Sequence, residues 1–239
     1  MKPPIGRTAC RSSTATFIRD LVINFLAIFL GIIITFAVQA RIDRSLDKKE
    51  IRSALELVRN ELTANMEDIV TMSDYIRDER RSAQYLLDHK DNLAKCPADS
   101  VNYHGGVLFA DAELSVSSDA LEMLKSSSMF QKIGDSRLSM KIVRAYDSCN
   151  SAASSLNNHV ATRNAFFSRS INEQNVGRIA PDGHVSIKEL IRTAYGLYSI
   201  RQTAALALPE NYVDLSDVED ALAAIDQYLQ KGRRLEKRR

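Results

Sequence analysis

The feature that most constrains this chain is the run from Leu21 to Val38, LVINFLAIFLGIIITFAV, which contains no charged residue. Thirteen of its eighteen residues are Leu, Ile, Val or Phe. As a helix the run would be roughly 27 Å long, close to the ~30 Å hydrocarbon core of a bilayer. These apolar side chains favour membrane insertion by about 4 to 8 kcal/mol. We therefore expect a transmembrane helix over residues 19–40 rather than a buried core helix.

The end of the run leaves one alternative open. Val38-Gln39-Ala40 fits the small-residue pattern of a signal-peptidase site, which would make the run a cleaved signal peptide. However, the run exceeds the usual apolar core of about 7–15 residues, and some twenty residues precede it. We therefore expect an uncleaved signal-anchor that crosses the bacterial inner (plasma) membrane once.

The basic residues around the run nearly balance, with four before it and five soon after it. The positive-inside rule therefore does not decide the orientation. A short tail before a signal-anchor can place the N-terminus in the cytoplasm. We expect this orientation, with residues 1–18 as a cytoplasmic tail and the main domain periplasmic.

One face of the expected membrane helix carries small and polar residues. They follow one another at steps of three or four and fall within about 120° around the helix axis. Small residues let membrane helices approach closely, and polar ones can hydrogen-bond across the contact. We expect this stripe to pack against a second copy or a partner helix; chance placement in an ordinary anchor is the alternative. The stripe comprises Asn24, Ala27, Gly31, Thr35 and Gln39.

The chain after the anchor predicts an all-α fold, a long helix leading into an antiparallel helical bundle over residues 41–230. The chain has only nine Gly and five Pro among 239 residues, which favours helix. Residues 41–95 show apolar positions at alternating steps of four and three, with Asn65 and Glu79 at two of these positions. The wide apolar face favours an intramolecular bundle over a parallel coiled coil, although the membrane-proximal part could also pair between chains.

Local signals place the remaining elements. Residues 96–116 are expected to be irregular or a short hairpin, with a turn at Gly105-Gly106. Helices are expected at 118–133 and 136–172, followed by a loop at 173–185. Two further helices open with capping boxes, the first at Ser186 and the second at Ser216. Asp119 and Glu122 have the spacing of a further capping box, at the start of the helix expected at 118–133. The helix that opens at Ser186 is expected to end at residue 208.

The residues that could carry chemistry are scattered. The net charge of +2 argues against nucleic-acid binding, and the four histidines fall in no metal-binding pattern. There is no P-loop, no GxSxG and no paired Glu-x-x-His. We expect no enzymatic activity, no cofactor and no metal. Cys96 and Cys149 are expected to be free thiols, with a disulfide as the alternative.

The last nine residues, KGRRLEKRR, form a basic tail at 231–239. Basic residues near an anionic membrane contribute about 1 kcal/mol each, so the tail is a candidate for contact with lipid head groups. A solvated, frayed tail is the alternative. Its basic residues are Lys231, Arg233, Arg234, Lys237, Arg238 and Arg239.

Two stretches, RDLVINFLAIFLGIIITFAVQARIDR and SSDALEMLKSSSMFQKIGDSRLSMKIVRAYDS, resemble a family of uncharacterised bacterial single-pass membrane proteins. This chain has Gln39-Ala40 and Ser127-Ser128 where the family has Asn-Trp and a glycine. The resemblance implies an N-terminal anchor and a helical extracytoplasmic domain, and it implies no activity. Together with the pattern, it predicts a membrane-anchored interaction or scaffold protein that forms oligomers. The alternative is a ligand-sensing bundle that signals through a membrane partner.

Overall fold

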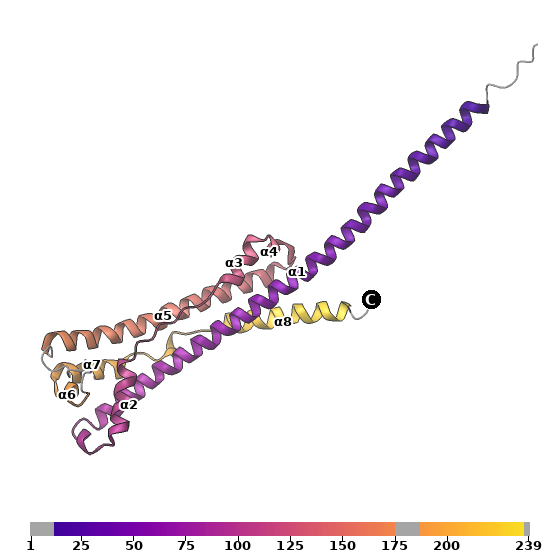
Figure 1. Cartoon of the computed structure of the whole chain (residues 1–239). Helices are drawn as coiled ribbons and strands as arrows, with labels where there is room; N and C mark the ends of the chain where they lie inside the picture. The colour runs from indigo at the N-terminus through magenta and orange to yellow at the C-terminus, as the bar shows by residue number, and fades with distance from the viewer. Residues whose placement is uncertain (1–11, 175–186, 237–239) are drawn as a thin grey trace, which may run out of the picture. The chain divides into compact units, whose positions relative to one another are not determined.

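The computed structural model describes residues 12–174 and 187–236 of the chain (Figure 1). All regular elements in these residues are helices, which confirms the predicted all-α class. The tail up to residue 11, most of the expected loop at 173–185 and the final three residues lie outside this description. The elements are α1 (Ser12–Asp88), η1 (Leu93–Lys95), α2 (Ala98–Phe109), α3 (Asp119–Ser126), α4 (Met129–Lys132), α5 (Ser136–Gln174), α6 (Ile187–Arg192), α7 (Ala194–Ala205), η2 (Pro209–Asn211) and α8 (Ser216–Glu236).

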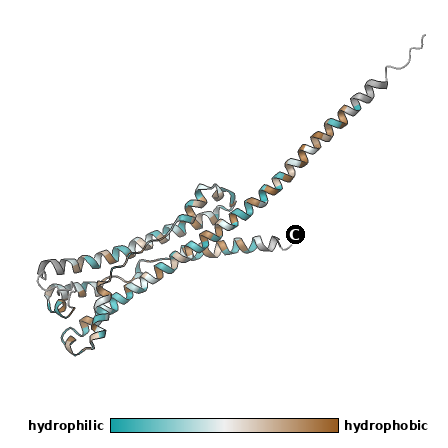
Figure 2. Ribbon diagram, viewed as in Figure 1, coloured by the Kyte–Doolittle hydropathy of each residue, from teal (hydrophilic) through white to brown (hydrophobic). Residues whose placement is uncertain are grey.

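Contacts within the chain divide it into two units, Met1–Arg52 and Ser53–Arg239. The first unit contains the apolar run, which is helical throughout as part of α1. Every side chain from Leu21 to Val38 is exposed, and Figure 2 shows this segment as largely apolar. The run is therefore a helix long and apolar enough to cross a membrane, with none of its surface covered by protein.

The second unit is a helical bundle, and its part of α1 buries the predicted stripe. The side chains at the four-three positions are at most 7 % exposed. Both polar members of this stripe are also buried, Asn65 at 3 % and Glu79 at 0 % exposure. The buried apolar members of the stripe in the second unit are Leu55, Val58, Leu62, Ile69, Met72, Ile76, Ala83 and Leu86.

Side-chain contacts between the long helices show their directions. On α1 and α5, Glu61 pairs with Tyr146 and Glu79 with Arg163, so residue numbers rise together and the two helices run parallel. Against α8 the order reverses, because Arg59 pairs with Asp226 whereas Arg77 pairs with Glu210 just before α8. The stretch from Glu210 through α8 therefore runs antiparallel to both long helices.

A non-helical segment makes the parallel arrangement of α1 and α5 possible. Residues 110–118, here called the strap, connect α2 to α3. Exposure alternates along the strap, with Leu114 and its even-numbered neighbours at 112, 116 and 118 half-buried and the odd-numbered residues exposed. This period of two is that of extended chain, which advances about 3.3 Å per residue against 1.5 Å in a helix. A few residues thus carry the chain back along α1.

The expected turn at Gly105-Gly106 is wrong, because both glycines lie inside α2. A Cβ atom on Gly105 would lie 2.3 Å from Cγ1 of Ile187 in α6, whereas a Cβ on Gly106 would meet nothing within 4 Å. Gly105 is therefore a point of close helix packing. A local Gly-Gly signal cannot distinguish this role from a turn.

The predicted helix at 118–133 is divided into α3 and α4. Ser128 adopts a left-handed backbone conformation with φ of 58° between them. Asp119 does not cap α3 with its side chain as expected, because the carboxylate of Glu61 on α1 accepts the backbone N–H of Ala120 at 3.1 and 3.2 Å. The cap comes from a distant element, which a local pattern cannot reveal.

The predicted helix from 186 to 208 is also interrupted. Thr193 separates α6 from α7, and its Oγ1 accepts the backbone N–H of Gly196 at 3.0 Å as a new N-cap. Ser186, the expected cap, lies outside the described residues. Ser216 is the first residue of α8 rather than its cap, and its backbone N–H donates to the carboxylate of Asp214 at 2.9 Å.

Substitution of the two glycines in α2 tests the packing. We expect Gly105→Ala to lower the free energy of unfolding by about 1–3 kcal/mol, because the added methyl must displace Ile187. Gly106→Ala is the matched control, and it should raise stability by about 0.5–1 kcal/mol through helix propensity. Denaturant titration followed by circular dichroism at 222 nm measures both. Equal effects would contradict the close packing of α2 on α6.

Candidate functional site

The polar groups inside the bundle converge on the strap. Its peptide groups form no ladder with another strand, so side chains from α1 and α5 supply partners. Asn157 on α5 donates to the carbonyl of Leu114 at 2.8 Å and accepts its N–H at 2.9 Å. Asn65 on α1 makes the same pair of bonds with Ser117, at 2.8 and 2.9 Å. Each amide thus takes the place of a neighbouring peptide group, and the strap is bonded to one helix on each side.

Arg163 on α5 holds the beginning of the strap and is only 1 % exposed. Its Nη1 donates to the carbonyls of Leu108 and Ala110 at 2.6 and 2.9 Å, and its Nη2 donates to Ala110 at 2.9 Å. The hydroxyl of Tyr75 on α1 donates to the carbonyl of Ala110 at 2.8 Å. One guanidinium thus binds the last carbonyls of α2 and the first carbonyl of the strap.

The charge of Arg163 is balanced by Glu79 on α1, which has no solvent exposure. Nη2 of Arg163 lies 2.9 Å from Oε1 of Glu79. Nε2 of His159, one turn before Arg163, lies 3.7 Å from Oε2, and the other ring nitrogen of His159 is 3.3 Å from the hydroxyl of Tyr212. The cluster therefore joins α1, α5 and the segment before α8.

Glu61 forms a second polar centre at the other end of the strap. Its carboxylate accepts hydrogen bonds from the hydroxyls of Tyr146 at 2.5 Å and Ser117 at 2.7 Å, besides the N–H of Ala120. A carboxylate at a helix N-terminus also interacts favourably with the helix dipole of α3. Glu61 therefore fastens the end of the strap, the start of α3 and Tyr146 of α5 to α1.

The electrostatics of these groups keep the buried phenols uncharged. Burial, followed by the charge of Glu79, raises the pKa of Tyr75 to about 12, and burial raises the pKa of Tyr212 to about 12. Burial and the hydrogen bond to Glu61 raise the pKa of Tyr146. These phenols therefore stay neutral donors at physiological pH. The buried charges face backbone carbonyls and one another, so the arrangement is suited to holding the strap in place.

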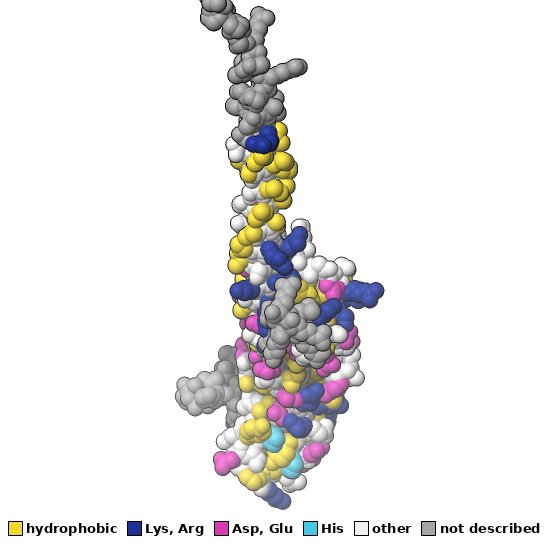
Figure 3. Space-filling model, turned by 90° about the vertical axis from the view of Figure 1, so that its right-hand side faces the viewer, with side chains coloured by type: hydrophobic (Ala, Val, Ile, Leu, Met, Phe, Trp, Pro, Cys, Tyr) yellow, Lys and Arg dark blue, Asp and Glu magenta, His cyan; other side chains and the backbone are white. Residues whose placement is uncertain are grey.

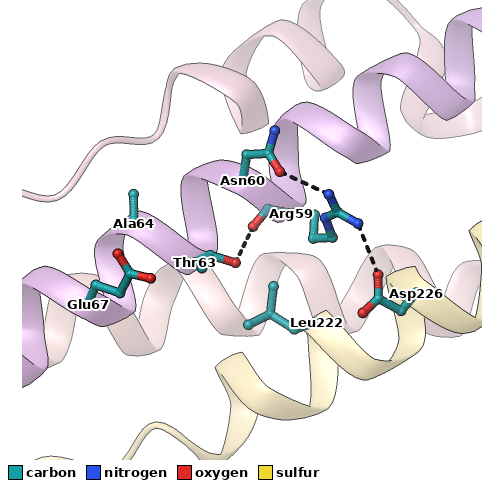
Figure 4. A pocket seen from close by; sticks show the side chains of 7 residues that line it. All are labelled: Arg59, Asn60, Thr63, Ala64, Glu67, Leu222 and Asp226. Atoms are coloured by element: carbon teal, nitrogen blue, oxygen red, sulfur yellow. Dashed lines mark hydrogen bonds and ion pairs between the residues drawn. The ribbon is translucent and has the colours of Figure 1, made fainter.

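The outer side of α1 and α8 forms a shallow, open groove with a volume of about 450 Å³ (Figure 4). At one end Arg59 pairs with Asp226 across the two helices at 3.4 Å, and Glu67 lies toward the other end. The side chain of Leu222 lies between them, and that of Ala64 lies beside Glu67. The groove mixes charges of both signs with apolar surface. Its lining residues are Arg59, Asn60, Thr63, Ala64, Glu67, Leu222 and Asp226.

The residues of the anchor stripe all lie on α1 and are exposed. The hydroxyl of Thr35 donates to the carbonyl of Gly31 at 2.8 Å, and Gln39 donates to Asp43 at 2.9 Å. A Cβ on Gly31 would meet nothing within 4 Å. Asn24 and Ala27 complete the stripe on the same helix. The structure therefore places the stripe on an open helix face.

The basic tail is described only at its start. Lys231 is exposed near the end of α8. Arg233 and Arg234 belong to the same helix, but their side chains lie outside the description. Lys237, Arg238 and Arg239 lie outside the described residues altogether. Because α8 is antiparallel to α1, its C-terminal end lies at the end of the bundle where α1 enters.

In the sequence, Asn65 and Glu79 stand out as polar interruptions of an apolar stripe, but their partners cannot be recognised there. Arg163 carried the same signal, because it falls on the four-three face of α5 between Val160 and Phe167. A charged residue at such a position requires a buried partner. Asn157 carried no such signal, since it lies beside this face and is half-buried.

The two described cysteines are free thiols, so the disulfide alternative is not formed. Cys149 on α5 lies in the core of the bundle with 0 % exposure, whereas Cys96 is half-buried. Burial raises the pKa of Cys149 to about 11. Only the thiolate reacts with disulfide reagents, so the two thiols should differ strongly in reactivity.

Loss of the side-chain amide of Asn157 should release the middle of the strap. We expect Asn157→Ala to lower the free energy of unfolding by about 1–3 kcal/mol, because it leaves both peptide groups of Leu114 without their partner. Asn158→Ala, at the exposed neighbouring position, is the matched control and should change stability by less than about 0.5 kcal/mol. Hydrogen exchange should speed up at the Leu114 amide in the first variant alone. An unchanged exchange rate there would show that Asn157 does not hold the strap.

Thiol reactivity tests the burial of Cys149. In a Cys10→Ser background at pH 8, we expect Ellman's reagent to modify Cys96 in the folded protein and Cys149 only after unfolding. A pKa of about 11 instead of 9 means about 100-fold less thiolate at this pH, and burial blocks access besides. Because the pKa of Cys149 is raised, the reactivity of this thiol should increase as the pH rises above 8. Equal rates for both thiols in the folded protein would contradict the core position.

Comparisons with known proteins give no further guide. No family model, curated protein or solved structure matches the chain. The family resemblance of the two stretches therefore stays a prediction, and the function has to be inferred from the residues and geometry of the chain itself.

Proposed function

We propose that this chain is a membrane-anchored helical interaction protein. In this proposal the Leu21–Val38 segment crosses the inner membrane and the bundle from Ser53 onward meets its partners outside the lipid. The observation that carries the proposal is the exposed apolar run, with a mean hydropathy of 2.8 and no part of it buried. An apolar helix surface of this length is unfavourable in water, and a bilayer is the environment that matches its length.

The interior of the bundle supports an interaction role over a catalytic one. The buried side chains of Asn65 and Arg163 and the half-buried side chain of Asn157 are hydrogen-bonded to the strap and make its position specific. Outside, the face seen in Figure 3 mixes basic and acidic side chains on the bundle, without a large area of one sign. Such a surface is typical of a domain that is exposed to water.

A second candidate function is a sensing bundle that signals through a membrane partner. One observation favours it, because neither carboxylate oxygen of Glu79 receives a hydrogen bond from the described residues. A buried polar group of this kind can mark a binding site inside a bundle. The fastening of the strap on both sides favours the interaction role, which we place first.

We further propose that the N-terminus is cytoplasmic, the bundle is periplasmic and the basic tail meets lipid head groups. The direction of α8 supports the last point, because the helix returns to the end of the bundle where α1 enters. Near an anionic surface, the basic residues of the tail would each contribute about 1 kcal/mol to binding.

The orientation is tested by fusions at the C-terminus in a bacterial host. We expect alkaline phosphatase to be active and a fluorescent protein to be dark, with the full-length fusion in the membrane fraction. A fluorescent fusion without phosphatase activity would reverse the orientation and direct the basic tail to the inner leaflet. A shortened, soluble product would show cleavage after Ala40 and contradict the anchor.

Oligomer formation is tested through the anchor stripe. We expect labelled copies in lipid vesicles to show energy transfer, and Gly31→Leu with Thr35→Leu to weaken association about tenfold, equal to about 1.4 kcal/mol. The added side chains would fill the open helix face that permits close approach. Ile33→Leu, on the opposite side of the helix, is the control and should leave the transfer unchanged. A wild type without transfer would exclude the oligomer.

A further inference from the structure

Among the described residues, no donor meets the carboxylate of Glu79 with the geometry of a hydrogen bond, and surface water does not reach this carboxylate. Its side chain has 0 % exposure, and both its oxygens as well as Nε of Arg163 are without a hydrogen-bond partner among the described residues. A buried polar atom without a partner is destabilising, and more so when it is charged. Native proteins satisfy such groups with other protein groups or with internal water.

The geometry of Arg163 explains why the ion pair does not satisfy Glu79. The terminal nitrogens of the guanidinium direct their N–H groups at the carbonyls of Leu108 and Ala110 and at the hydroxyl of Tyr75. Glu79 therefore touches Nη2 at 2.9 Å as a counter-charge but does not lie along an N–H bond. A guanidinium has five N–H donors, and the one on Nε remains.

His159 brings a second donor to the same carboxylate. The hydroxyl of Tyr212 lies 3.3 Å from Nδ1, and this phenol stays protonated because burial raises its pKa to about 12. If Tyr212 donates to Nδ1, the hydrogen of the neutral ring is on Nε2, which faces Glu79. The distance from Nε2 to Oε2 is 3.7 Å, longer than a hydrogen bond.

We propose that Glu79, Arg163 and His159 form a binding site for a buried water molecule. The water accepts the N–H of Arg163 Nε and donates to the carboxylate of Glu79. Nε belongs to the same planar group as Nη2, and Nη2 lies 2.9 Å from Oε1 of Glu79. The water thus supplies both kinds of hydrogen bond that the site lacks.

The charge of the site selects water over an ion. The positive charge of Arg163 balances the negative charge of Glu79, and the phenols of Tyr75 and Tyr212 are neutral. A cation would meet the guanidinium and an anion would meet the carboxylate, so neither gains from entering. This internal water would satisfy the carboxylate oxygens of Glu79, so that no sensed ligand is needed to explain them. The site therefore agrees with the interaction role and gives no support to the sensing role.

The experiment is NMR on the full ¹⁵N-labelled chain in detergent micelles, observing the side-chain Nε–H signals of arginine. Arg163→Lys identifies the signal of Arg163 by its loss. We expect a cross-peak between this Nε–H and water with the sign of a long-lived complex. Absence of the cross-peak in the wild type, at a temperature where the signal is sharp, would overturn the proposal.

Two sets of variants exclude other sources of the cross-peak. Tyr75→Phe and Tyr212→Phe remove the hydroxyls that could exchange with bulk water, and the cross-peak should persist in both. Its disappearance in either variant would assign it to hydroxyl exchange and overturn the proposal. Glu79→Gln keeps an acceptor and should retain the cross-peak. In Glu79→Leu, loss of the cross-peak with the Arg163 signal still present supports the site, and a retained cross-peak contradicts it.

Discussion

The bundle depends on hydrogen bonds between side chains and the peptide groups of the strap. An extended segment between two helices has no neighbouring strand, and its polar backbone must still be satisfied where it is buried. Asn65 and Asn157 solve this by presenting an amide to one peptide unit each. Arg163 serves the carbonyls where α2 ends and the strap begins. Without these groups, the apolar contacts of the strap would have to offset several unsatisfied polar atoms.

This fastening determines the arrangement of the helices. The strap returns the chain along α1 in few residues, so α5 can start again from the same end and run parallel to α1. Arg163 can lie in this interior only because Glu79 balances its charge. Glu61 adds the N-terminal cap of α3 at the other end of the strap. Side chains from two long helices thus replace the backbone pairing that a sheet would have provided.

The anchor and the bundle follow opposite rules. In the bundle, other helices bury the apolar stripe of α1. The two polar residues of the stripe, Asn65 and Glu79, lie beside polar or charged groups of the strap and of α5. In the anchor the apolar side chains point outward around the whole helix, and the backbone is satisfied within the helix itself. The same helix, α1, contains both patterns. This change of pattern along α1 is the physical basis for proposing a membrane-bound interaction protein.

The sequence by itself determined the elements whose signals repeat along the chain. The apolar run, the stripe from Leu55 to Leu86 and the long helix α5 follow from periodicity, which is local and recurs every turn. The tertiary structure decided what depends on single distant contacts. Ile187 requires a glycine at 105 inside a helix, and Glu61 caps a helix in place of Asp119. Asn65 was recognisable as an exception, but its partner Ser117 lies 52 residues away. No periodicity links such positions, so only the fold brings them together.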